Sequence, residues 1–547
     1  MTTTASPLAQ VWPADFARRY REDGYWTGET FPAVLRAMVE TRGEAIAVIG
    51  GDQRWSYAEL GRRADVAAAG FLALGLAPGD RVVVQLPNIA EFFAVVFGLF
   101  RAGLIPVFAL PDHRLAEVSH FARKAGAAAC VIADTHNGFD YRPLGHALQQ
   151  EVPGVRHVIV VGDPGGHVPF SGFVADPERL PDTDPDPSSV ALVQVSGGST
   201  GLSKLIPRTH DDYLYSIRTS NEICGMTPES VYLAALPVAH NFPMSSPGIF
   251  GAIRAGARVV MSPLPNPETA FPLIARERVT ITGLVPPLAL LWLQAAPRTA
   301  HDLSSLEVLQ VGGAKFMPEA AKRVRPVLGC TLQQVFGMAE GLVNYTRLDD
   351  PEDIITETQG RPMSPGDEVL LLDDQGQPVP EGVSGNLHTR GPYTIRAYHD
   401  DAGANARSFT DDGFYRTGDV VRRLPGGYLV MQGRATDHIN RAGEKISAEE
   451  VEDHLLAHPR VFDAAVVSIP DKFLGERSCA FVISEGEAPK PAELKSWMRE
   501  RDIAPFKVPD QIVFVDSFAT TAVGKISRKE LRASLRASLL EQEGSKP

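Results

Sequence analysis

Short apolar runs alternate with segments of helical spacing along the first four-fifths of the chain. Apolar positions recur at helical spacing over residues 57–74, and Gly75 is placed to end that helix. A second helix is predicted over residues 89–101, with Gly103 as its end. Strands are predicted at the β-branched runs between such segments: 81–86, 104–110, 127–133, 157–161, 190–195, 257–261, 280–285 and 306–311. This alternation predicts an α/β fold of mostly parallel sheets covered by helices on both faces.

The C-terminal part of the chain follows a different pattern. Ser447, with Glu450 three positions later, forms a capping box that predicts a helix ending just before Pro459. A second helix is predicted after Pro491, and strands are predicted at residues 461–469, 479–484 and 512–516. This order of elements predicts a compact α+β module with a small core of its own.

The length of 547 residues is more than one ordinary domain holds. We expect a large N-terminal domain over residues 1–433 and a small C-terminal domain over residues 434–547. Apolar residues make up 44% and charged residues 22%, as in soluble globular proteins. The net charge of −13 is spread along the chain without a basic stripe, so we expect no nucleic acid polymer as a partner.

The sequence indicates neither a secretory signal nor a membrane-spanning segment. The N-terminus has no basic start followed by an apolar run, and the longest apolar stretch, residues 92–100, is broken by Arg101. The four cysteines lie far apart and none belongs to a CxxC pair: Cys130, Cys224, Cys330 and Cys479. This spacing argues against a zinc site or a disulfide framework, and we expect small core residues in a cytoplasmic protein.

A run of glycines and hydroxyl residues, SGGSTGLSK at residues 196–204, follows the strand-like run ALVQV. Glycines let backbone amides approach an anion closely, and the hydroxyls and Lys204 add donors and positive charge. The run is not a Walker loop, because Lys204 lies three residues after Gly201 instead of directly after a glycine. Taken alone, the pattern fits either a phosphate-binding loop or a flexible surface turn.

This run resembles the phosphate-binding signature of the adenylate-forming superfamily, which includes acyl-CoA synthetases, luciferases and the adenylation domains of peptide synthetases. Further stretches resemble the motifs of that superfamily in its order: VGGAK at 311–315, FGMAE at 336–340, YRTGD at 415–419, GR at 433–434, RAGEK at 441–445 and GK at 524–525. The resemblance covers the chain from residue 190 to its end. It implies an enzyme that activates a carboxylic acid with ATP and then passes it to a carrier thiol.

The resemblance also implies roles for the phosphate and metal ligands. Activation joins two anions, so the site must neutralise charge and hold the reactants in line. Glu340 resembles the superfamily's Mg²⁺ ligand, a hard oxygen donor. Ala339 stands where the superfamily often has Thr, so one hydroxyl contact to phosphate is absent. The departing phosphates would be held by Lys204 with Ser196, Gly197, Gly198, Ser199 and Thr200.

Nucleotide contacts are implied for a second group of residues. Asp419 would accept hydrogen bonds from both ribose hydroxyls, and Arg434 would contact the nucleotide at the start of the hinge. The adenine and the rest of the nucleotide would lie against Gly312, Gly313, Ala314, Lys315, Gln334, Val335 and Phe336, with Gly313 also next to the acid. The competing interpretations are a turn-forming Asp, a solvated Arg and glycines that merely mark loops.

Lys525 matches the superfamily's lysine that reaches the reacting carboxylate and the α-phosphate. Because it lies on the small C-terminal domain, that domain must close to assemble the site for the first step. In the superfamily the domain then rotates, so that the loop around Gly443 faces the site for thioester formation. Thr436 stands where the hinge residue is commonly Asp or Lys, so Thr436 and Asp437 are both candidate pivots of a mobile domain.

The stretch PVAHNFPMSSPG at residues 237–248 resembles the branch that activates aryl acids for siderophore assembly. Asn241 would hydrogen-bond the hydroxyl ortho to the carboxylate of the acid. His240 would be either an aromatic gate near that carboxylate or a packing residue. The resemblance thus implies a small aromatic acid as substrate and, as partner, an aryl carrier protein bearing phosphopantetheine.

Two positions separate the substrates of this branch. Enzymes for 2,3-dihydroxybenzoate tend to have Ser and Val where Ser246 and Val343 stand, and salicylate enzymes tend to have Cys and Leu or Ile. With salicylate, Ser246 would lose a partner at a cost of about 1–3 kcal/mol. We therefore favour 2,3-dihydroxybenzoate. The alternatives are a salicylate or other benzoate ligase, acting on a carrier protein or coenzyme A, and a non-enzymatic nucleotide-binding scaffold.

Overall fold

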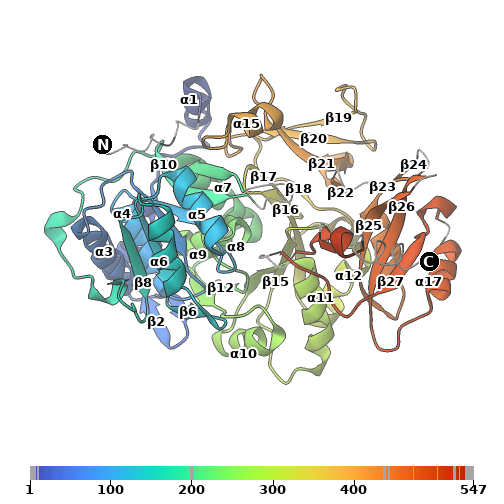
Figure 1. The fold of residues 1–547 in the computed structure, drawn as a ribbon, viewed down its shortest axis with the longest axis horizontal. Coiled ribbons are helices and arrows are strands. Elements are labelled where there is room, and N and C mark those ends of the chain that lie inside the picture. Colours follow the sequence, from blue (N-terminus) through green and yellow to red (C-terminus); the bar gives the residue numbers. More distant parts are fainter. Residues whose placement is uncertain are drawn as a thin grey trace.

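The two largest β-sheets of the computed structural model (Figure 1) have seven and nine strands. The structure describes residues 8, 12–196, 203–434, 439–441, 444–471, 474–501, 503–521, 525–528 and 530–535.

The seven-stranded sheet has the order β11-β10-β4-β3-β5-β8-β9. All neighbours are parallel except β11, which pairs antiparallel with β10. Its strands are β3 (Arg81–Gln85), β4 (Ile105–Phe108), β5 (Ala129–Ala133), β8 (His157–Val161), β9 (Val168–Pro169), β10 (Val190–Val195) and β11 (Leu205–Thr209). A short separate hairpin joins β6 (Thr135–His136) and β7 (Phe139–Asp140).

The nine-stranded sheet has the order β18-β17-β16-β15-β14-β12-β13-β1-β2. It is parallel from β16 to β1, and its antiparallel strands β17, β18 and β2 lie at the two ends. Its strands are β1 (Ile46–Gly50), β2 (Gln53–Ser56), β12 (Val231–Ala234), β13 (Arg258–Met261), β14 (Ile281–Leu284), β15 (Val308–Gly312), β16 (Thr331–Met338), β17 (Gly341–Tyr345) and β18 (Arg361–Pro362).

Helices cover both large sheets. Because β3 connects to β4 in one direction and β4 to β5 in the other, right-handed crossovers place α4 and α5 on opposite faces of the seven-stranded sheet. On the α4 side, α2, α3, α4 and α9 pack on one another and on strands of both sheets. The helices of this region are α1 (Ala14–Glu22), α2 (Phe31–Arg42), α3 (Tyr57–Ala73), α4 (Glu91–Arg101), α5 (Leu115–Ala125), α6 (Arg142–Glu151), α7 (His210–Cys224), α8 (Asn241–Ser245) and α9 (Gly248–Ala255).

The predicted pattern of the body is confirmed. The helices expected at 57–74 and 89–101 are α3 and α4, and Gly75 and Gly103 have φ values of +78° and +69°. The four cysteines are buried, as expected of core residues. Over the nine-stranded sheet and beside it lie α10 (Pro267–Glu277), α11 (Pro286–Ala295), α12 (Pro318–Ala321), α13 (Val324–Leu328) and α14 (Glu352–Glu357). No helix in the described ranges is long and apolar enough to cross a bilayer.

A third sheet, which the sequence pattern had not indicated, follows the two large ones. It is fully antiparallel and consists of β19 (Glu368–Leu372), β20 (Ser384–Arg390), β21 (Tyr415–Arg423) and β22 (Leu429–Arg434), with α15 (Ala402–Ser408) between β20 and β21. The strand β20 alternates between buried and partly exposed residues, as expected of a sheet with one face toward solvent.

The C-terminal module has its own sheet and core, as predicted. Its strands are β23 (Ile439–Arg441), β24 (Glu444–Ile446), β25 (Val461–Asp471), β26 (Gly475–Ser484) and β27 (Gln511–Phe514), and its helices are α16 (Ala448–Leu456) and α17 (Pro491–Glu500). It contacts the body where α16 meets α12 and β22, and where β25 meets α11 (Figure 1). The domain division at residues 433/434 stays a prediction.

Only one of the two hydrogen bonds of the predicted capping box of α16 is present. The Ser447 hydroxyl accepts the backbone N–H of Glu450 at 3.4 Å, as an N-cap does. The Glu450 carboxylate does not return to the N-cap, because it pairs with the Lys507 ammonium at 2.6 Å. A charge partner distant in sequence therefore replaces the local backbone partner.

Close packing of α3 on α4 generates a stability prediction for Gly98. An added Cβ at Gly98 would lie 2.5 Å from Ala67 Cβ, so Gly98→Ala must push the two helices apart. Such overpacking costs about 1–3 kcal/mol, of which helix propensity returns about 1 kcal/mol. The matched control is Gly403→Ala on exposed α15, where a Cβ meets only the end of Arg407 at 3.5 Å. Urea denaturation should give a lower midpoint for Gly98→Ala than for Gly403→Ala, and the reverse order would contradict this packing.

Candidate active site

The base of the predicted phosphate loop lies between the antiparallel strands β10 and β11. The backbone N–H of Ser196 donates to the Lys204 carbonyl at 2.9 Å, and the backbone N–H of Lys204 donates to Ser196 Oγ at 2.9 Å. Gly197, Gly198, Ser199 and Thr200 lie outside the described residues. The Lys204 ammonium lies 4.5 Å from the centre of the Tyr398 ring, within cation–π range.

Glu340 lies in the two-residue turn between β16 and β17 and is 9% exposed. Its carboxylate Oε1 accepts a hydrogen bond of 2.8 Å from the Tyr398 hydroxyl, which is itself 3.1 Å from the Tyr415 hydroxyl. Burial raises the pKa of both Tyr398 and Tyr415, and the nearby Glu340 charge acts in the same direction. Both phenols are therefore neutral hydrogen-bonding groups beside the carboxylate.

Asp419 lies on β21 and is 2% exposed. Its Oδ1 is 2.9 Å from Arg434 Nε, and β21 pairs with β22 at these two residues. Burial raises the pKa of Asp419 to about 6, although the Arg434 charge opposes the rise, and the Glu449 and Glu340 charges add to it. The structure thus brings together the two residues that were predicted to contact the nucleotide from different motifs.

Lys525 reaches this region from the C-terminal module. A Cβ added at Gly313 would lie 2.7 Å from Lys525 Cε, and Gly313 has φ +85°, so glycine provides both the space and the backbone conformation. Burial lowers the pKa of Lys525 to about 8, the Arg434 charge acts in the same direction, and the Asp419 and Glu340 charges oppose it. The lysine predicted to be catalytic therefore lies among the predicted ribose and metal ligands.

His240 begins the short helix α8. Its Nδ1 accepts the backbone N–H of Phe242 at 3.3 Å, so the ring caps the helix. Burial lowers the pKa of His240 to about 3, and the charge of nearby Lys525 adds to this. A neutral imidazole beside Lys525 is compatible with the predicted gate near the carboxylate of the substrate. Its capping contact with α8 is also compatible with the alternative, a packing role.

The predicted acid-binding residues lie on α8, directly after it and on β17. Asn241 Oδ1 accepts the Tyr213 hydroxyl at 2.8 Å, which leaves its amide N–H groups as the available donors. Ser246 is buried near Tyr345, whose hydroxyl is 2.8 Å from Ser220 Oγ. The Tyr345 hydroxyl is therefore a polar group close to the Ser246 side chain.

Val343 is buried on β17, and its backbone N–H donates to the Tyr393 hydroxyl at 3.0 Å. A Cβ added at Gly337 on the neighbouring strand would lie 3.1 Å from both methyl carbons of Val343. A larger side chain at position 343 would therefore have to extend elsewhere than toward β16.

Two side chains that were predicted to contact the nucleotide have other partners. Gln334 Nε2 donates to the carbonyls of Ile355 and Thr356, and its Oε1 accepts from Gln359. Lys315 Nζ donates to the Met431 carbonyl at 3.0 Å. Both side chains thus connect neighbouring segments of the body.

The remaining predicted nucleotide contacts lie on β15, β16 and the turn that follows β15. Gly312 is buried opposite Val335 in the parallel pair, Ala314 is exposed, and Phe336 packs in a cluster with Leu342. An added Cβ at Gly312 would lie 2.7 Å from the Val335 carbonyl oxygen, so the two backbones meet closely here.

Four tyrosines that contact these residues were missed by the sequence analysis: Tyr213, Tyr345, Tyr393 and Tyr398. Tyr345 lies only two residues from Val343, but nothing in the local pattern indicates that its hydroxyl meets Ser220 at 2.8 Å. These contacts depend on the tertiary fold alone.

The fold and the convergence of these motifs are those of an adenylate-forming ligase, and the chain belongs to the AMP-binding enzyme family. The family model "AMP-binding enzyme" matches residues 35–399, and "AMP-binding enzyme C-terminal domain" matches residues 450–525. Membership in this family makes ATP the nucleotide substrate.

Relatives match along nearly the whole chain. The 2,3-dihydroxybenzoate-AMP ligase of Bacillus subtilis (strain 168) is 58% identical over 529 residues, which cover 97% of this chain and 98% of that protein. The salicyl-AMP ligase / salicyl-S-ArCP synthetase of Mycobacterium tuberculosis is 47% identical, over 95% and 93%. Among solved structures, that of Mycobacterium smegmatis MbtA in its apo form has a TM-score of 0.75 and 48% identity, covering 96% of this chain and 99% of that one.

The lowered pKa of Lys525 predicts a pH dependence of adenylation. Lys525 is charged below its pKa of about 8 and loses its charge as the pH rises through that value, so the charge that favours anions is lost on the alkaline side. Acid-dependent exchange between ATP and pyrophosphate should show a kcat/KM that falls above about pH 8, since kcat/KM reports groups of the free enzyme. Lys525→Arg stays charged throughout, so its slower reaction should lack this decline. The same decline in both proteins would assign it to another group.

Proposed function

We propose that the protein is a 2,3-dihydroxybenzoate–AMP ligase that passes the activated aryl group to the phosphopantetheine thiol of an aryl carrier protein in siderophore assembly. The observation that carries the proposal is the position of Lys525, which reaches from the C-terminal module to Gly313 beside the charges of Asp419 and Glu340. The 58% identical relative, which bears that enzyme name, supports the choice of acid.

In the proposed first step, an oxygen of the aryl carboxylate attacks the α-phosphorus of ATP. A bond forms between the carboxylate oxygen and the α-phosphorus. The bond between the α-phosphorus and the oxygen that bridges it to the β-phosphorus breaks, and pyrophosphate leaves. The Lys525 ammonium balances the negative charge that gathers between the two anions, and Lys204 with its loop holds the departing phosphates. Asp419 accepts hydrogen bonds from the ribose hydroxyls. Because Arg434 Nε contacts Asp419 Oδ1 in this structure, Arg434 must share that oxygen with the ribose or move away from it.

Glu340 fits a role as a Mg²⁺ ligand. One of its oxygens accepts from Tyr398, and the second oxygen is not engaged in any hydrogen bond that the described residues form. Within the described ranges, no three His, Cys, Asp or Glu side chains gather into a cage. A single carboxylate is what Mg²⁺ uses when phosphates supply further ligands. When bound, the ion would neutralise phosphate charge, and Glu340 would hold it on the β16–β17 turn.

The acid site would hold the aromatic ring between α8 and β17. The Asn241 amide group, oriented by Tyr213, offers donors to the carboxylate side of the ring. Ser246 would face the second ring hydroxyl, and Val343 would leave room for it. His240, held neutral, would close the acid site next to Lys525 without adding a competing charge.

Transfer to the carrier would follow a rotation of the C-terminal domain, which we assign to residues 434–547. The candidate pivots Thr436 and Asp437, and Gly443 of the loop that would then face the site, lie outside the described residues. The position of Lys525 corresponds to the arrangement needed for the first step. The same module must therefore leave before a thiol can reach the aryl group.

Salicylate is the second candidate acid, and one observation favours it. The Tyr345 hydroxyl lies near Ser246 and would be available to pair with the Ser246 hydroxyl when salicylate is bound. The penalty of about 1–3 kcal/mol for an unsatisfied group then falls toward the low end of its range. Several relatives that are 47–49% identical have names that refer to pyochelin or salicyl substrates.

Pyrophosphate exchange with a panel of benzoates tests the function. We expect the highest kcat/KM with 2,3-dihydroxybenzoate, and Lys525→Ala should lower the rate by about 100- to 1,000-fold, as the loss of one preorganised donor does. Higher kcat/KM with salicylate would replace the proposed acid. Absence of exchange with every aryl acid would favour a nucleotide-binding scaffold.

The two pocket positions generate a selectivity prediction. Ser246→Cys together with Val343→Leu removes a strong hydrogen-bonding group and fills space, so the ratio of kcat/KM for 2,3-dihydroxybenzoate to that for salicylate should fall about tenfold. The substitution Val369→Leu, on β19 outside the predicted site, is a control for added volume alone and should leave the ratio unchanged. If the double variant keeps the wild-type ratio, these positions do not select the acid.

A further inference from the structure

We propose that residues 392–398 form a positioning segment that holds both functional ends of the active-site turn, defined as residues 339–343: the two residues between β16 and β17 and the first three residues of β17. One end of the turn carries Glu340 and the other carries Val343, so the segment would set the metal ligand and the acid pocket separately. This inference rests on the proposed function and extends it to residues that none of the motifs contains.

The metal end of the turn is held by two groups of the segment. The backbone N–H of Ile395 donates to the Glu340 carbonyl at 2.7 Å, and the Tyr398 hydroxyl donates to Glu340 Oε1 at 2.8 Å. Backbone and carboxylate of one residue are therefore both fixed. The face of the same Tyr398 ring lies 4.5 Å from the Lys204 ammonium, so one buried side chain contacts both the metal ligand and the phosphate-binding lysine.

The acid end of the turn is held by Tyr393. Its hydroxyl accepts the Val343 backbone N–H at 3.0 Å and donates to Asp367 Oδ2 at 2.7 Å. Tyr393 is 1% exposed, so neither contact is shared with bulk water. Between the two ends, a Cβ at Gly341 would lie 2.4 Å from Thr394 Cα. The two backbones therefore meet closely at Gly341 and Thr394, next to the hydrogen bond between Ile395 and Glu340.

The segment is itself anchored to rigid parts of the body. Arg208, 2% exposed, donates to the carbonyls of both Ala339 and Tyr393, at 2.8 and 3.0 Å, so one guanidinium joins the turn to the segment. Its Nε donates to Asp212, which also accepts the indole N–H of Trp12 at 3.0 Å.

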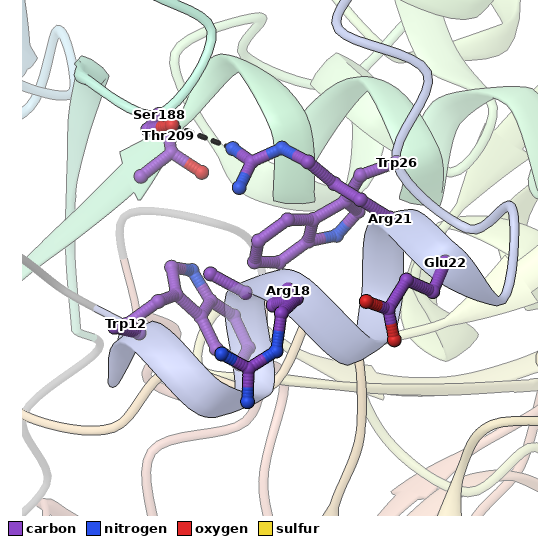
Figure 2. Close-up of a pocket in the computed structure, with 9 residues that line it drawn as sticks. Trp12, Arg18, Arg21, Glu22, Trp26, Ser188 and Thr209 are labelled. Atoms are coloured by element: carbon purple, nitrogen blue, oxygen red, sulfur yellow. Dashed lines mark hydrogen bonds between the residues drawn. The ribbon is translucent and has the colours of Figure 1, made fainter.

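The N-terminal region adds a second anchor. The indole N–H of Trp26 donates to the Pro392 carbonyl at 2.9 Å. Figure 2 shows Trp12 and Trp26 beside α1, in the surface pocket where Arg21 reaches Ser188. Both tryptophans thus connect α1 to the support of the active-site turn.

The two tyrosine hydroxyls orient Glu340 and Val343 and do not themselves contact a substrate. Removal of one hydroxyl should therefore change either the binding of Mg²⁺ or the choice of acid, but not both. Second-layer hydrogen bonds to metal ligands are worth about 10- to 100-fold in metal affinity. The Tyr398 hydroxyl belongs to the metal end, and the Tyr393 hydroxyl belongs to the acid end. Phe at either position keeps the ring and deletes only the hydrogen bonds.

The experiment compares Tyr398→Phe, Tyr393→Phe and the control Tyr141→Phe. Tyr141 is also a buried tyrosine with a hydroxyl-to-carbonyl bond, 2.9 Å to Pro111, but it lies outside the site. Three quantities are measured: the Mg²⁺ concentration for half-maximal pyrophosphate exchange, the gain in ATP affinity that Mg²⁺ gives in calorimetry, and the kcat/KM ratio for 2,3-dihydroxybenzoate over salicylate.

Tyr398→Phe should raise the half-maximal Mg²⁺ concentration about tenfold and reduce the Mg²⁺-dependent gain in ATP affinity, with the acid ratio unchanged. Tyr393→Phe should change the acid ratio severalfold with the Mg²⁺ dependence unchanged. Tyr141→Phe should change none of the three.

Two outcomes would overturn the inference: wild-type Mg²⁺ dependence in Tyr398→Phe, or equal effects of all three variants on every quantity. Both require an active wild-type enzyme, whereas a wild-type protein without exchange activity would contradict the proposed function itself.

Discussion

The positive charge of Lys525 is the constraint on which the arrangement of the site depends. Two carboxylates, Asp419 and Glu340, lie within its electrostatic reach in surroundings that disfavour charge, and the nucleotide phosphates would add further negative charge. The body supplies Lys204, and Arg434 lies at its boundary with the C-terminal domain, at the end of β22, but the third cation comes from a module with a separate core. While Lys525 is in place, its charge favours the close approach of the carboxylate and the ATP phosphates. Because Lys525 belongs to a separate module, it can then move away and leave room for the thiol.

Much of this arrangement could be predicted from the sequence, because the residues concerned belong to short contiguous motifs. Glu340 belongs to the run FGMAE, Asp419 and Arg434 lie on paired strands, and the ends of the loop at Ser196 and Lys204 meet as a hairpin base. Strand periodicity indicated half of the strands of the two large sheets, since buried parallel strands are nearly continuous apolar runs: β3, β4, β5, β8, β10, β13, β14 and β15. The expected fold class and family were confirmed on that basis.

The parts that could not be predicted share a physical cause, which is that their partners are distant in sequence. Tyr398 lies 58 residues from Glu340, and Arg208 lies 185 residues from Tyr393. No local pattern indicates such hydrogen bonds. The same applies to Glu450, whose local capping role is replaced by Lys507, and to Gln334, whose motif position indicated a nucleotide contact while its side chain is satisfied inside the body. The antiparallel sheet β19–β22 was missed because its strands are only half buried, so polar residues interrupt their apolar runs.

The position of β1 in the nine-stranded sheet has a consequence for biosynthesis. Val48 of β1 is paired on one side with nearby Trp55 of β2, and on the other with Val259 of β13. Until the ribosome has released the chain beyond Met261, the early hairpin has one open edge of the kind that invites wrong pairing. The nascent N-terminal region must therefore wait through the translation of all residues from Ser56 to Met261 before its sheet can close, which makes this edge a natural place for a chaperone to act.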